Sequence, residues 1–358
     1  MKTETAMPPA TPPSATWSDQ EAGPLVTPAD RYRAMRLIRR FEEIALELVK
    51  QGVIVGGTHP YIGQEAVAVG VCAALRADDV LTSTHRGHGH VLAKGAEPRR
   101  VLAELAGRID GLNRGRGGSM HAADFARGIL GANGIVGAGA PIAAGAAWAL
   151  RKEGSDRVAV SFFGDGALNQ GVLLETLNLA AIWQLPVLFV CENNGYATTL
   201  PARTAVAGSA VGRAAACGIR AETVDGMDAE AVLAASADAV RHARSGQGPA
   251  FLECLTYRFE GHHTMERRFR LNYRGAEEVE LWRARDPLLL GGALIPDEER
   301  SRIDAEVDEL LAKAREFALA SPAPEPADAA KYLYADGSRA RPGAGVGAGA
   351  GAGAGAAV

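Results

Sequence analysis

The chain has 358 residues, 47% of them hydrophobic, and a formal net charge of −4 at pH 7. This length can bury a large core, and the slightly acidic balance excludes a protein that holds nucleic acid mainly through charge. No apolar run approaches the length of a membrane-spanning helix, so we expect no membrane partner. The four cysteines stand singly without C-x-x-C spacing, which favours reduced thiols over disulfides or zinc ligands.

A segment rich in Pro, Ala and Thr, residues 1–26, opens the chain. It lacks the apolar core of a signal peptide and the arginines of a transit peptide, so we expect a disordered leader on a cytoplasmic protein. The sequence TPAD at residues 27–30 has the capping hydroxyl, proline and acid of a helix start. The apolar stripe that follows predicts a helix ending at Gly52, whose arginines and glutamates we expect to form a solvated or subunit-facing surface.

A loop containing His59 leads to a predicted helix over residues 66–75 that is apolar nearly all round, which is typical of a buried helix. A short strand is predicted at residues 80–84. The polar sequence HRGHGH follows it at residues 85–90.

Arg86, in that polar sequence, suits a phosphate, because a guanidinium can donate two parallel hydrogen bonds to an anion. A zinc site built from His85, His88 and His90 is the competing interpretation. No other role is predicted for His88 and His90.

The next segments contain many small residues. A helix continues over residues 101–105, and the glycine and arginine loop at residues 113–120 is too flexible to pack alone, so we expect it to order against a cofactor or a partner subunit. Gly137-x-Gly139 lacks the third glycine and the preceding strand of a dinucleotide fingerprint, which argues against a nicotinamide enzyme. A helix of alanines is predicted at residues 141–150.

The most informative segment runs from residue 158 to residue 196. It contains an apolar strand (158–163), the turn Gly164-Asp165-Gly166, a helix (169–183), a second apolar strand (187–191) and then Glu192-Asn193-Asn194. In such a β-α-β unit both strands end at the same edge of a parallel sheet, where α/β proteins bind ligands. We therefore expect Asp165 and Asn194 to lie side by side.

A carboxylate beside an amide oxygen supplies the hard ligands that Mg²⁺ prefers, and Mg²⁺ completes its octahedron with phosphate oxygens and water. The glycines that flank Asp165 let the backbone approach a phosphate, and the following helix start favours an anion. The segment therefore predicts a site for a magnesium diphosphate. The alternative without a ligand is an ordinary strand-turn-helix in which the aspartate caps the helix.

Strand, helix and strand alternate again at residues 219–224, 229–241 and 250–256, which extends the parallel sheet. A charged loop with Gly261-His262-His263 follows, and then a surface helix at residues 297–319. We predict an α/β fold with a mostly parallel sheet flanked by helices, one catalytic domain over residues 27–320 and a low-complexity Pro/Ala/Gly tail over residues 321–358.

Several motifs occur in the order of one known family: HPYIGQEA (59–66), STHRGHG (83–89), GRGGSMH (115–121), GIVG (134–137), and GDG (164–166) with NN (193–194). Together they resemble the α subunit of the E1 component of 2-oxo acid dehydrogenase complexes, over roughly residues 32–287. The resemblance implies a thiamine-diphosphate-binding fold, with thiamine diphosphate and Mg²⁺ as cofactors.

The resemblance also implies roles for particular residues. The metal ligands would be Asp165, Asn194 and the carbonyl of Tyr196, and the catalytic candidates His59 and His262. The cofactor-binding residues would be His85, Arg86, Gly134, Val136, Gly164, Asp165, Gly166, Ala167, Asn194, Tyr196 and His262.

The carboxylic acid that activates the cofactor in this family lies on a separate β chain, and no residue here is assigned to that role. The resemblance therefore implies an α2β2 heterotetramer that decarboxylates a 2-oxo acid and acylates a lipoylated E2 component. Pyruvate, acetoin and a branched-chain 2-oxo acid remain open as substrates. A hypothesis of a different class is a non-catalytic α-like scaffold that pairs with β but binds no cofactor.

Overall fold

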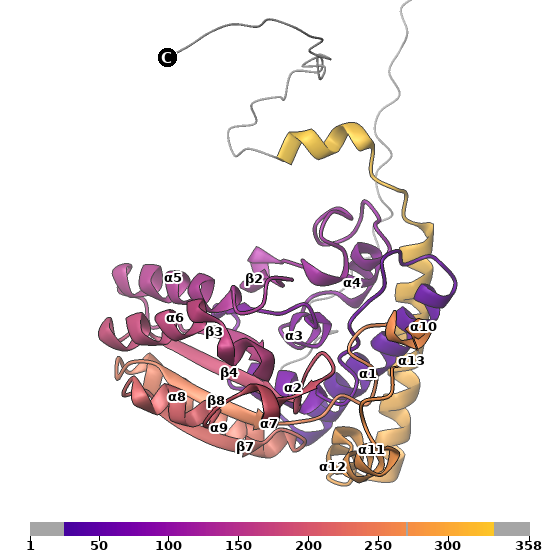
Figure 1. Cartoon of the computed structure of the whole chain (residues 1–358). Helices are drawn as coiled ribbons and strands as arrows, with labels where there is room; N and C mark the ends of the chain where they lie inside the picture. The colour runs from indigo at the N-terminus through magenta and orange to yellow at the C-terminus, as the bar shows by residue number, and fades with distance from the viewer. Residues whose placement is uncertain (1–24, 270, 333–358) are drawn as a thin grey trace, which may run out of the picture.

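A six-stranded sheet forms the centre of the chain, in a computed structural model that describes residues 25–269 and 271–332. The strand order is β2-β1-β3-β4-β8-β7, and every neighbouring pair is parallel (Figure 1). The strands are β1 (Val80–Thr82), β2 (Ile129–Gly131), β3 (Ala159–Gly164), β4 (Val187–Asn193), β7 (Arg220–Asp225) and β8 (Ala250–Leu255). The predicted α/β class is confirmed. Most of the predicted leader and tail, residues 1–24 and 333–358, lies outside the described residues.

Alternate residues of the central strands point to two separate cores. Val160, Phe162 and Leu188 pack with α1 (Pro28–Lys50), α2 (Glu65–Ala73) and α9 (Ala229–Arg244). Ala159, Phe163 and Phe189 pack with α5 (Gly139–Lys152), α6 (Gly171–Ile182) and α8 (Ala210–Ala216). Because helices cover both faces, the strands are continuously apolar, as buried parallel strands are.

The other elements are shorter, apart from one long helix, α13 (Asp297–Ala320). They are α3 (His88–Ala93), α4 (Pro98–Leu105), η1 (Gly118–Met120), η2 (Phe125–Arg127), η3 (Asp165–Asn169), β5 (Tyr196–Ala197), β6 (Leu200–Pro201), α7 (Ala202–Ala205), α10 (Glu266–Phe269), α11 (Ala276–Arg283), α12 (Pro287–Gly292) and η4 (Pro326–Tyr332). The β5–β6 pair is an antiparallel hairpin.

The predicted β-α-β unit is confirmed, with one difference at its turn. The chain makes a 3-10 turn, η3, directly after β3, and α6 begins only at Gly171. The strand predicted at residues 80–84 ends earlier, at Thr82, and edge strand β2 was not predicted. With only three residues and Gly131 at its end, β2 carries too little apolar pattern to be recognised.

The charges of the first helix match the predicted solvated or subunit-facing surface only in part. Its arginines make ion pairs within the chain, some buried and some partly exposed: Arg33 with Glu306, Arg36 with Asp304, Arg39 with Glu65 and Asp286, and Arg31 with Glu230. Two of these partners lie on α13, which buries Ile303, Val307 and Leu311 against the core that contains α1. Sequence pattern alone cannot pair charges that stand some 270 positions apart.

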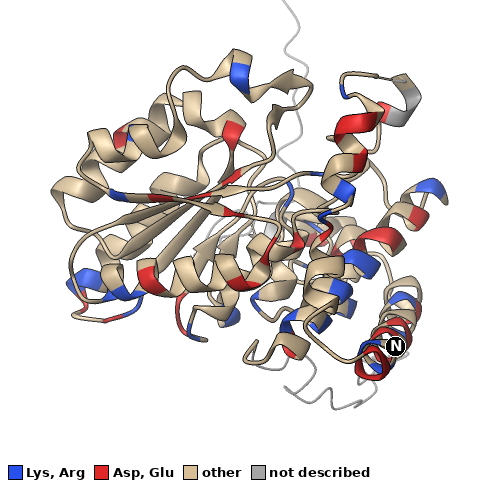
Figure 2. Cartoon of the chain, turned by 90° about the horizontal axis from the view of Figure 1, so that it is seen from below, with Lys and Arg blue, Asp and Glu red and all other residues tan. Residues whose placement is uncertain are grey.

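Basic and acidic residues are interleaved over the face of the molecule shown in Figure 2, and they do not gather into one basic surface. All four cysteines are free thiols, and Cys72, Cys191 and Cys254 are buried. Within residues 25–269 and 271–332, no helix combines the length and apolarity needed to cross a membrane.

Two helical glycines offer a matched test of the packing of α2. A Cβ on Gly70 would lie 2.7 Å from Cβ of Val232 on α9, whereas one on Gly145 of α5 would meet no atom within 4 Å. We expect Gly70→Ala to lower the free energy of unfolding by about 1–3 kcal/mol through overpacking. Gly145→Ala should instead raise it by about 0.5–1 kcal/mol, because alanine favours the helix. Urea titration measures both, and equal effects would contradict the close α2–α9 contact.

Candidate active site

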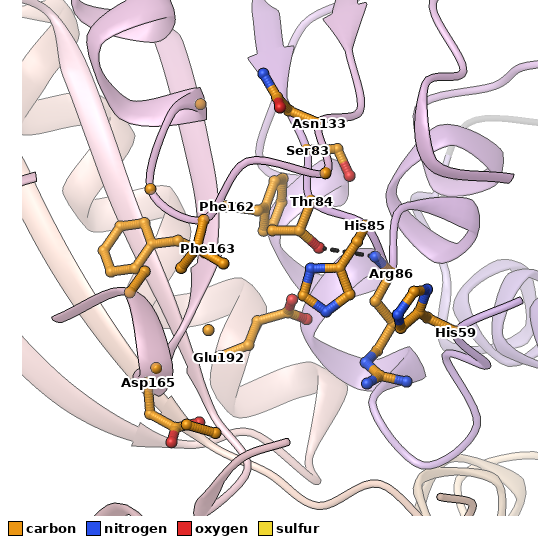
Figure 3. Close-up of a pocket in the computed structure, with 18 of the residues that line it drawn as sticks. His59, Ser83, Thr84, His85, Arg86, Asn133, Phe162, Phe163, Asp165 and Glu192 are labelled. Carbon is orange, nitrogen blue, oxygen red and sulfur yellow. Dashed lines mark hydrogen bonds between the residues drawn. The ribbon is translucent and has the colours of Figure 1, made fainter. Parts of the chain in front are cut away.

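One cavity opens at the carboxyl ends of the central strands, with a volume of about 330 Å³. It is large enough for a small molecule or the polar end of a cofactor. Figure 3 shows side chains from several separate segments converging on it. Every residue assigned a site role from the sequence lines this cavity, namely His59, His85, Arg86, Gly134, Val136, Gly164, Asp165, Gly166, Ala167, Asn194, Tyr196 and His262.

Asp165 marks one end of the cavity. Its side chain is 1% exposed, and neither carboxylate oxygen has a hydrogen-bond partner. Burial raises the pKa of Asp165 to about 6. The main-chain amides of Asp165 and Asn194, which lie near the carboxylate but outside hydrogen-bonding geometry, and the charge of Arg258 act in the opposite direction. A buried carboxylate without a partner is costly unless a cation binds it.

Asn194 follows β4 at the same sheet edge. Its amide nitrogen donates to Oε1 of Gln64 at 3.0 Å, and its Oδ1 accepts from the main-chain nitrogen of Tyr196 at 3.2 Å. These two bonds fix which atom of the amide is oxygen, and that oxygen can still accept from or coordinate a second group. The carboxylate of Asp165, Oδ1 of Asn194 and the nearby main chain therefore form a donor set that fits Mg²⁺.

Histidines and Arg86 form the opposite end of the cavity. The ring of His59 lies 4.6 Å from the ring of His85, 4.8 Å from that of His262 and 4.6 Å from that of His263, measured between centroids. Arg86 donates to the carbonyl of Pro60 at 2.5 Å and to that of His262 at 3.2 Å. The side chain of Arg86 is thus held by main-chain oxygens and not by a carboxylate.

The imidazoles at this end are neutral near pH 7. Burial, reinforced by the charge of Arg86, lowers the pKa of His85 to about 4 and the pKa of His262 to about 2. Burial, with His85 and Arg86 acting in the same direction, also lowers the pKa of His59 well below its usual range. Burial also lowers the pKa of Arg86 to about 10, so Arg86 remains charged. A fixed cation surrounded by neutral N–H donors favours an anion.

A metal ion at these histidines is a second possibility, because ligand atoms of His59, His85 and His262 all lie within 4.8 Å of one another. The guanidinium of Arg86 lies 3.2 Å from Nδ1 of His262, however, and its charge opposes a cation there. The structure does not bring His85, His88 and His90 together, so the zinc site considered from the sequence is not formed.

His88 and His90 face away into separate buried networks. Nδ1 of His88 lies 2.9 Å from Oε1 of Glu42 and its Nε2 lies 2.9 Å from Oγ of Ser119. Nδ1 of His90 lies 2.8 Å from Oγ of Ser83, and its Nε2 lies 3.3 Å from Glu192. Both nitrogens of each ring are therefore engaged within the protein.

The neutral histidines predict a loss of stability in acid. Below pH 6.5 an unfolded chain takes up a proton on each histidine, whereas folded His85 stays neutral down to about pH 4. The contribution of His85 to the free energy of unfolding is therefore undiminished above pH 6.5, and it decreases as the pH is lowered towards 4. We expect His85→Gln to reduce the loss of unfolding free energy between pH 7 and pH 5 by about 1–2 kcal/mol. Urea titrations at both pH values test this, and an unchanged loss would contradict it.

The glycine and arginine loop differs from its prediction. We expected a cofactor or partner to order it, but four of its main-chain amides, those of Asn113, Gly115, Gly117 and Gly118, donate to the buried carboxylate of Glu104. The loop ends at Met120, which lines the cavity. Nothing in the sequence around Glu104 indicated this role.

The edge of the cavity near Gly134 and Val136 is open. Ile135 is 72% exposed and Val136 is 44% exposed, which is unusual for large apolar side chains beside a cavity. Among the described residues that line the cavity, the acids are Asp165 and Glu192. No carboxylate therefore stands at this edge within the part of the chain that the structure describes.

Sequence reasoning missed several residues that line the cavity, including Gln64, Ser83, Phe162, Gln170 and Glu192. Gln64 and Glu192 stand inside motifs that were recognised, directly after Gly63 and directly before Asn193. The direction of a side chain at the end of a strand would have identified Glu192, since alternate residues face opposite sides of a sheet.

A sequence profile of the family described as dehydrogenase E1 component matches residues 33–327. The chain belongs to the dehydrogenase E1 component family. The resemblance recognised from the motifs is thereby confirmed.

Individual members of the family that resemble the chain are α subunits. The chain is 44% identical over 299 residues to pyruvate dehydrogenase E1 component subunit alpha of Rhizobium meliloti, which covers 81% of this chain and 85% of the relative. It is 46% identical over 300 residues to the alpha subunit of acetoin:2,6-dichlorophenolindophenol oxidoreductase of Cupriavidus necator, covering 81% and 89%. The same subunit of Bacillus subtilis is 49% identical over 232 residues, covering 64% and 70%.

The dehydrogenase E1 family depends on thiamine diphosphate, and its α subunits act together with β subunits. The cavity fits the diphosphate end of that cofactor in two respects. It has an unpartnered buried carboxylate for a cation at one end, and an arginine with neutral imidazoles for an anion at the other.

Proposed function

We propose that this chain is the α subunit of a thiamine-diphosphate-dependent 2-oxo acid dehydrogenase, of the pyruvate dehydrogenase type. It would bind the magnesium diphosphate end of the cofactor and, with a β subunit in an α2β2 heterotetramer, decarboxylate a small 2-oxo acid and acylate a lipoyl group of an E2 component. The bound cofactor supplies the electron sink for decarboxylation.

One observation supports this proposal above the others: both oxygens of Asp165 are buried and unpartnered beside Asn194, at the sheet edge between β3 and β4. Such a carboxylate needs a cation, and the hard oxygen donors suit Mg²⁺. The carbonyl of Tyr196 is the proposed third protein ligand. Gly164, Gly166 and Ala167 line the same wall and leave room for phosphate oxygens to approach the main chain.

Arg86, His85 and His262 are the proposed diphosphate contacts at the other end. Arg86 is 4% exposed and is held in place by the carbonyls of Pro60 and His262, so its guanidinium is already oriented. His59 and His262 are the proposed catalytic residues. They are neutral at pH 7, so each ring can donate one hydrogen bond and accept another.

A partner chain would complete the site. The edge formed by Gly134, Ile135 and Val136 is the proposed place of the aminopyrimidine, and no acid stands there among the described residues. The exposed Ile135 and Val136 are the surface that a β subunit would cover. The chain alone should therefore bind weakly and be inactive.

An acetoin dehydrogenase α subunit is the second candidate, because relatives of that name are 46% and 49% identical to this chain. The assay combines the chain with its β subunit, thiamine diphosphate and Mg²⁺, and compares pyruvate, branched-chain 2-oxo acids and acetoin with dichlorophenolindophenol as electron acceptor. Turnover of a 2-oxo acid supports the first candidate and turnover of acetoin the second. A well-folded complex that binds the cofactor and turns over none of them would overturn both.

The scaffold hypothesis makes a different prediction, since a pairing partner without a cofactor would assemble with β normally. An Asp165→Ala complex that assembles and retains full activity would favour it.

A further inference from the structure

The floor of the cavity contains a buried carboxylate, that of Glu192. Glu192, on β4, is 2% exposed and lines the cavity together with Phe162 and His85. The hydroxyl of Tyr61 donates to Oε1 of Glu192, and Nε2 of His90 lies 3.3 Å from its Oε2. Both oxygens of this carboxylate are thus held from behind the cavity wall.

His90 is itself fixed on three sides. Its Nδ1 lies 2.8 Å from Oγ of Ser83, its Nε2 lies 3.2 Å from the hydroxyl of Tyr61, and its ring stacks on Phe162 at 3.8 Å between centroids. If the Ser83 hydroxyl donates to Nδ1, the Nε2–H is free to donate to Glu192, and all polar atoms of the network are satisfied. A fully satisfied buried network of this kind holds its members in one geometry.

The carboxylate points at a histidine. Figure 3 shows Glu192 extending into the cavity towards the ring of His85. Arg86, Arg258 and His263 also act electrostatically on His85, and the rings of His59 and His262 pack against it. Burial and the two arginines oppose a positive charge on His85, and Glu192 favours one.

The carboxylate of Glu192 would repel a bound diphosphate and weaken its binding, unless a positive charge pairs with both anionic groups. We propose that Glu192 is a positioning residue of the diphosphate subsite, held by Tyr61 and His90 so that His85 takes up a proton when the diphosphate binds. The inference rests on the proposed function, because the diphosphate supplies the negative charge that His85 then meets. The proton comes from the solvent and adds to the imidazole ring, and no bond between heavy atoms forms or breaks.

Proton uptake can be measured without any turnover. Thiamine diphosphate is titrated with Mg²⁺ into the complex of this chain and its β subunit at pH 6.5, in two buffers of low and high ionisation enthalpy. The dependence of the binding enthalpy on the buffer gives the number of protons taken up. If the diphosphate restores the pKa of His85 to the ordinary imidazole value of about 6.5, His85 takes up about half a proton per site, and Asp165, whose pKa is about 6, releases about a quarter of a proton when Mg²⁺ binds. We therefore expect a net uptake in the wild type.

Four variants locate the proton. Glu192→Gln, which keeps the shape of the side chain, should at least halve the uptake and weaken binding by about tenfold, the equivalent of one pKa unit. His85→Gln should lower the uptake by a similar amount. The double variant should show no further loss beyond His85→Gln, because Glu192 acts through His85. Tyr61→Phe removes one hydrogen bond to Glu192 without changing its charge, so it should cause a smaller loss in the same direction.

The outcomes separate this inference from the proposed function. If no sample binds thiamine diphosphate although the complex is folded, the proposed function fails. If the wild type binds without proton uptake, or if the Glu192→Gln and Tyr61→Phe complexes take up as many protons as the wild type, the role of Glu192 is overturned. Should Glu192→Gln fail to fold, Tyr61→Phe with His85→Gln decides the question by the same criteria.

Discussion

Asp165→Asn should stabilise the cofactor-free chain while it abolishes magnesium-dependent cofactor binding. The carboxylate is buried without a hydrogen-bond partner, and its pKa is raised to about 6 from the ordinary value of 3.8. A raised acid pKa means that the folded chain holds the proton more tightly than the unfolded chain, so stability falls as the pH rises from 3.8 to 6. Above pH 6 the full cost remains, up to about 3 kcal/mol.

Asparagine carries no charge and removes that cost. At pH 7.5, without Mg²⁺, we expect the free energy of unfolding of Asp165→Asn to exceed that of the wild type by about 1–3 kcal/mol, and the difference to shrink to about half at pH 5. Urea titration at the two pH values measures it, with the exposed Asp78→Asn as a control that should change little. A destabilised Asp165→Asn chain at pH 7.5 would show that Asp165 is structural and not a cation ligand.

Glu104→Ala should unfold or strongly weaken the wall of the cavity that carries Met120. The Glu104 carboxylate is fully buried, with Oε1 accepting from Gly117 at 2.7 Å and Oε2 from Asn113 at 2.8 Å and Gly115 at 2.9 Å. Removing it leaves several amides without acceptors at once, so we expect a loss of about 3–5 kcal/mol in the free energy of unfolding. Glu104→Gln keeps one acceptor oxygen and should lose about half as much.

The loss of the Glu104 carboxylate should loosen this loop before it unfolds the whole chain. Arg114 and Arg116 are exposed in this loop, so limited trypsin digestion should cut there sooner in Glu104→Ala than in the wild type. Glu175→Ala, at an exposed position of α6, is the control and should change neither stability nor digestion. If Glu104→Ala is as stable and as resistant to trypsin as Glu175→Ala, Glu104 does not anchor the loop.

The parts of this protein that the sequence predicted well are those in which local pattern and chain order suffice. The apolar runs of β3 and β4 and the helix between them define a β-α-β unit, and its geometry brings Asp165 and Asn194 to one cavity without further information. The recognised motifs added His59, His85, Arg86 and His262, which all line the same cavity.

The parts that the sequence did not predict depend on pairing between distant side chains. Tyr61, His90 and Glu192 come from three segments, and the hydrogen bond between Tyr61 and Glu192 joins residues 131 positions apart. The four amides gathered by Glu104 and the ion pairs between α1 and α13 are of the same kind. A single sequence gives the number of such charges but not their partners, because each surface arginine has many possible acids.

Calorimetric titration with thiamine diphosphate and Mg²⁺ tests directly whether the end of the cavity at Asp165 holds a magnesium diphosphate. The chain alone, its complex with β and the Asp165→Ala complex are compared. We expect tight, magnesium-dependent binding in the wild-type complex, weak binding to the chain alone and none to the Asp165→Ala complex. A well-folded wild-type complex that shows no heat of binding, or binding that Asp165→Ala leaves unchanged, would contradict this expectation.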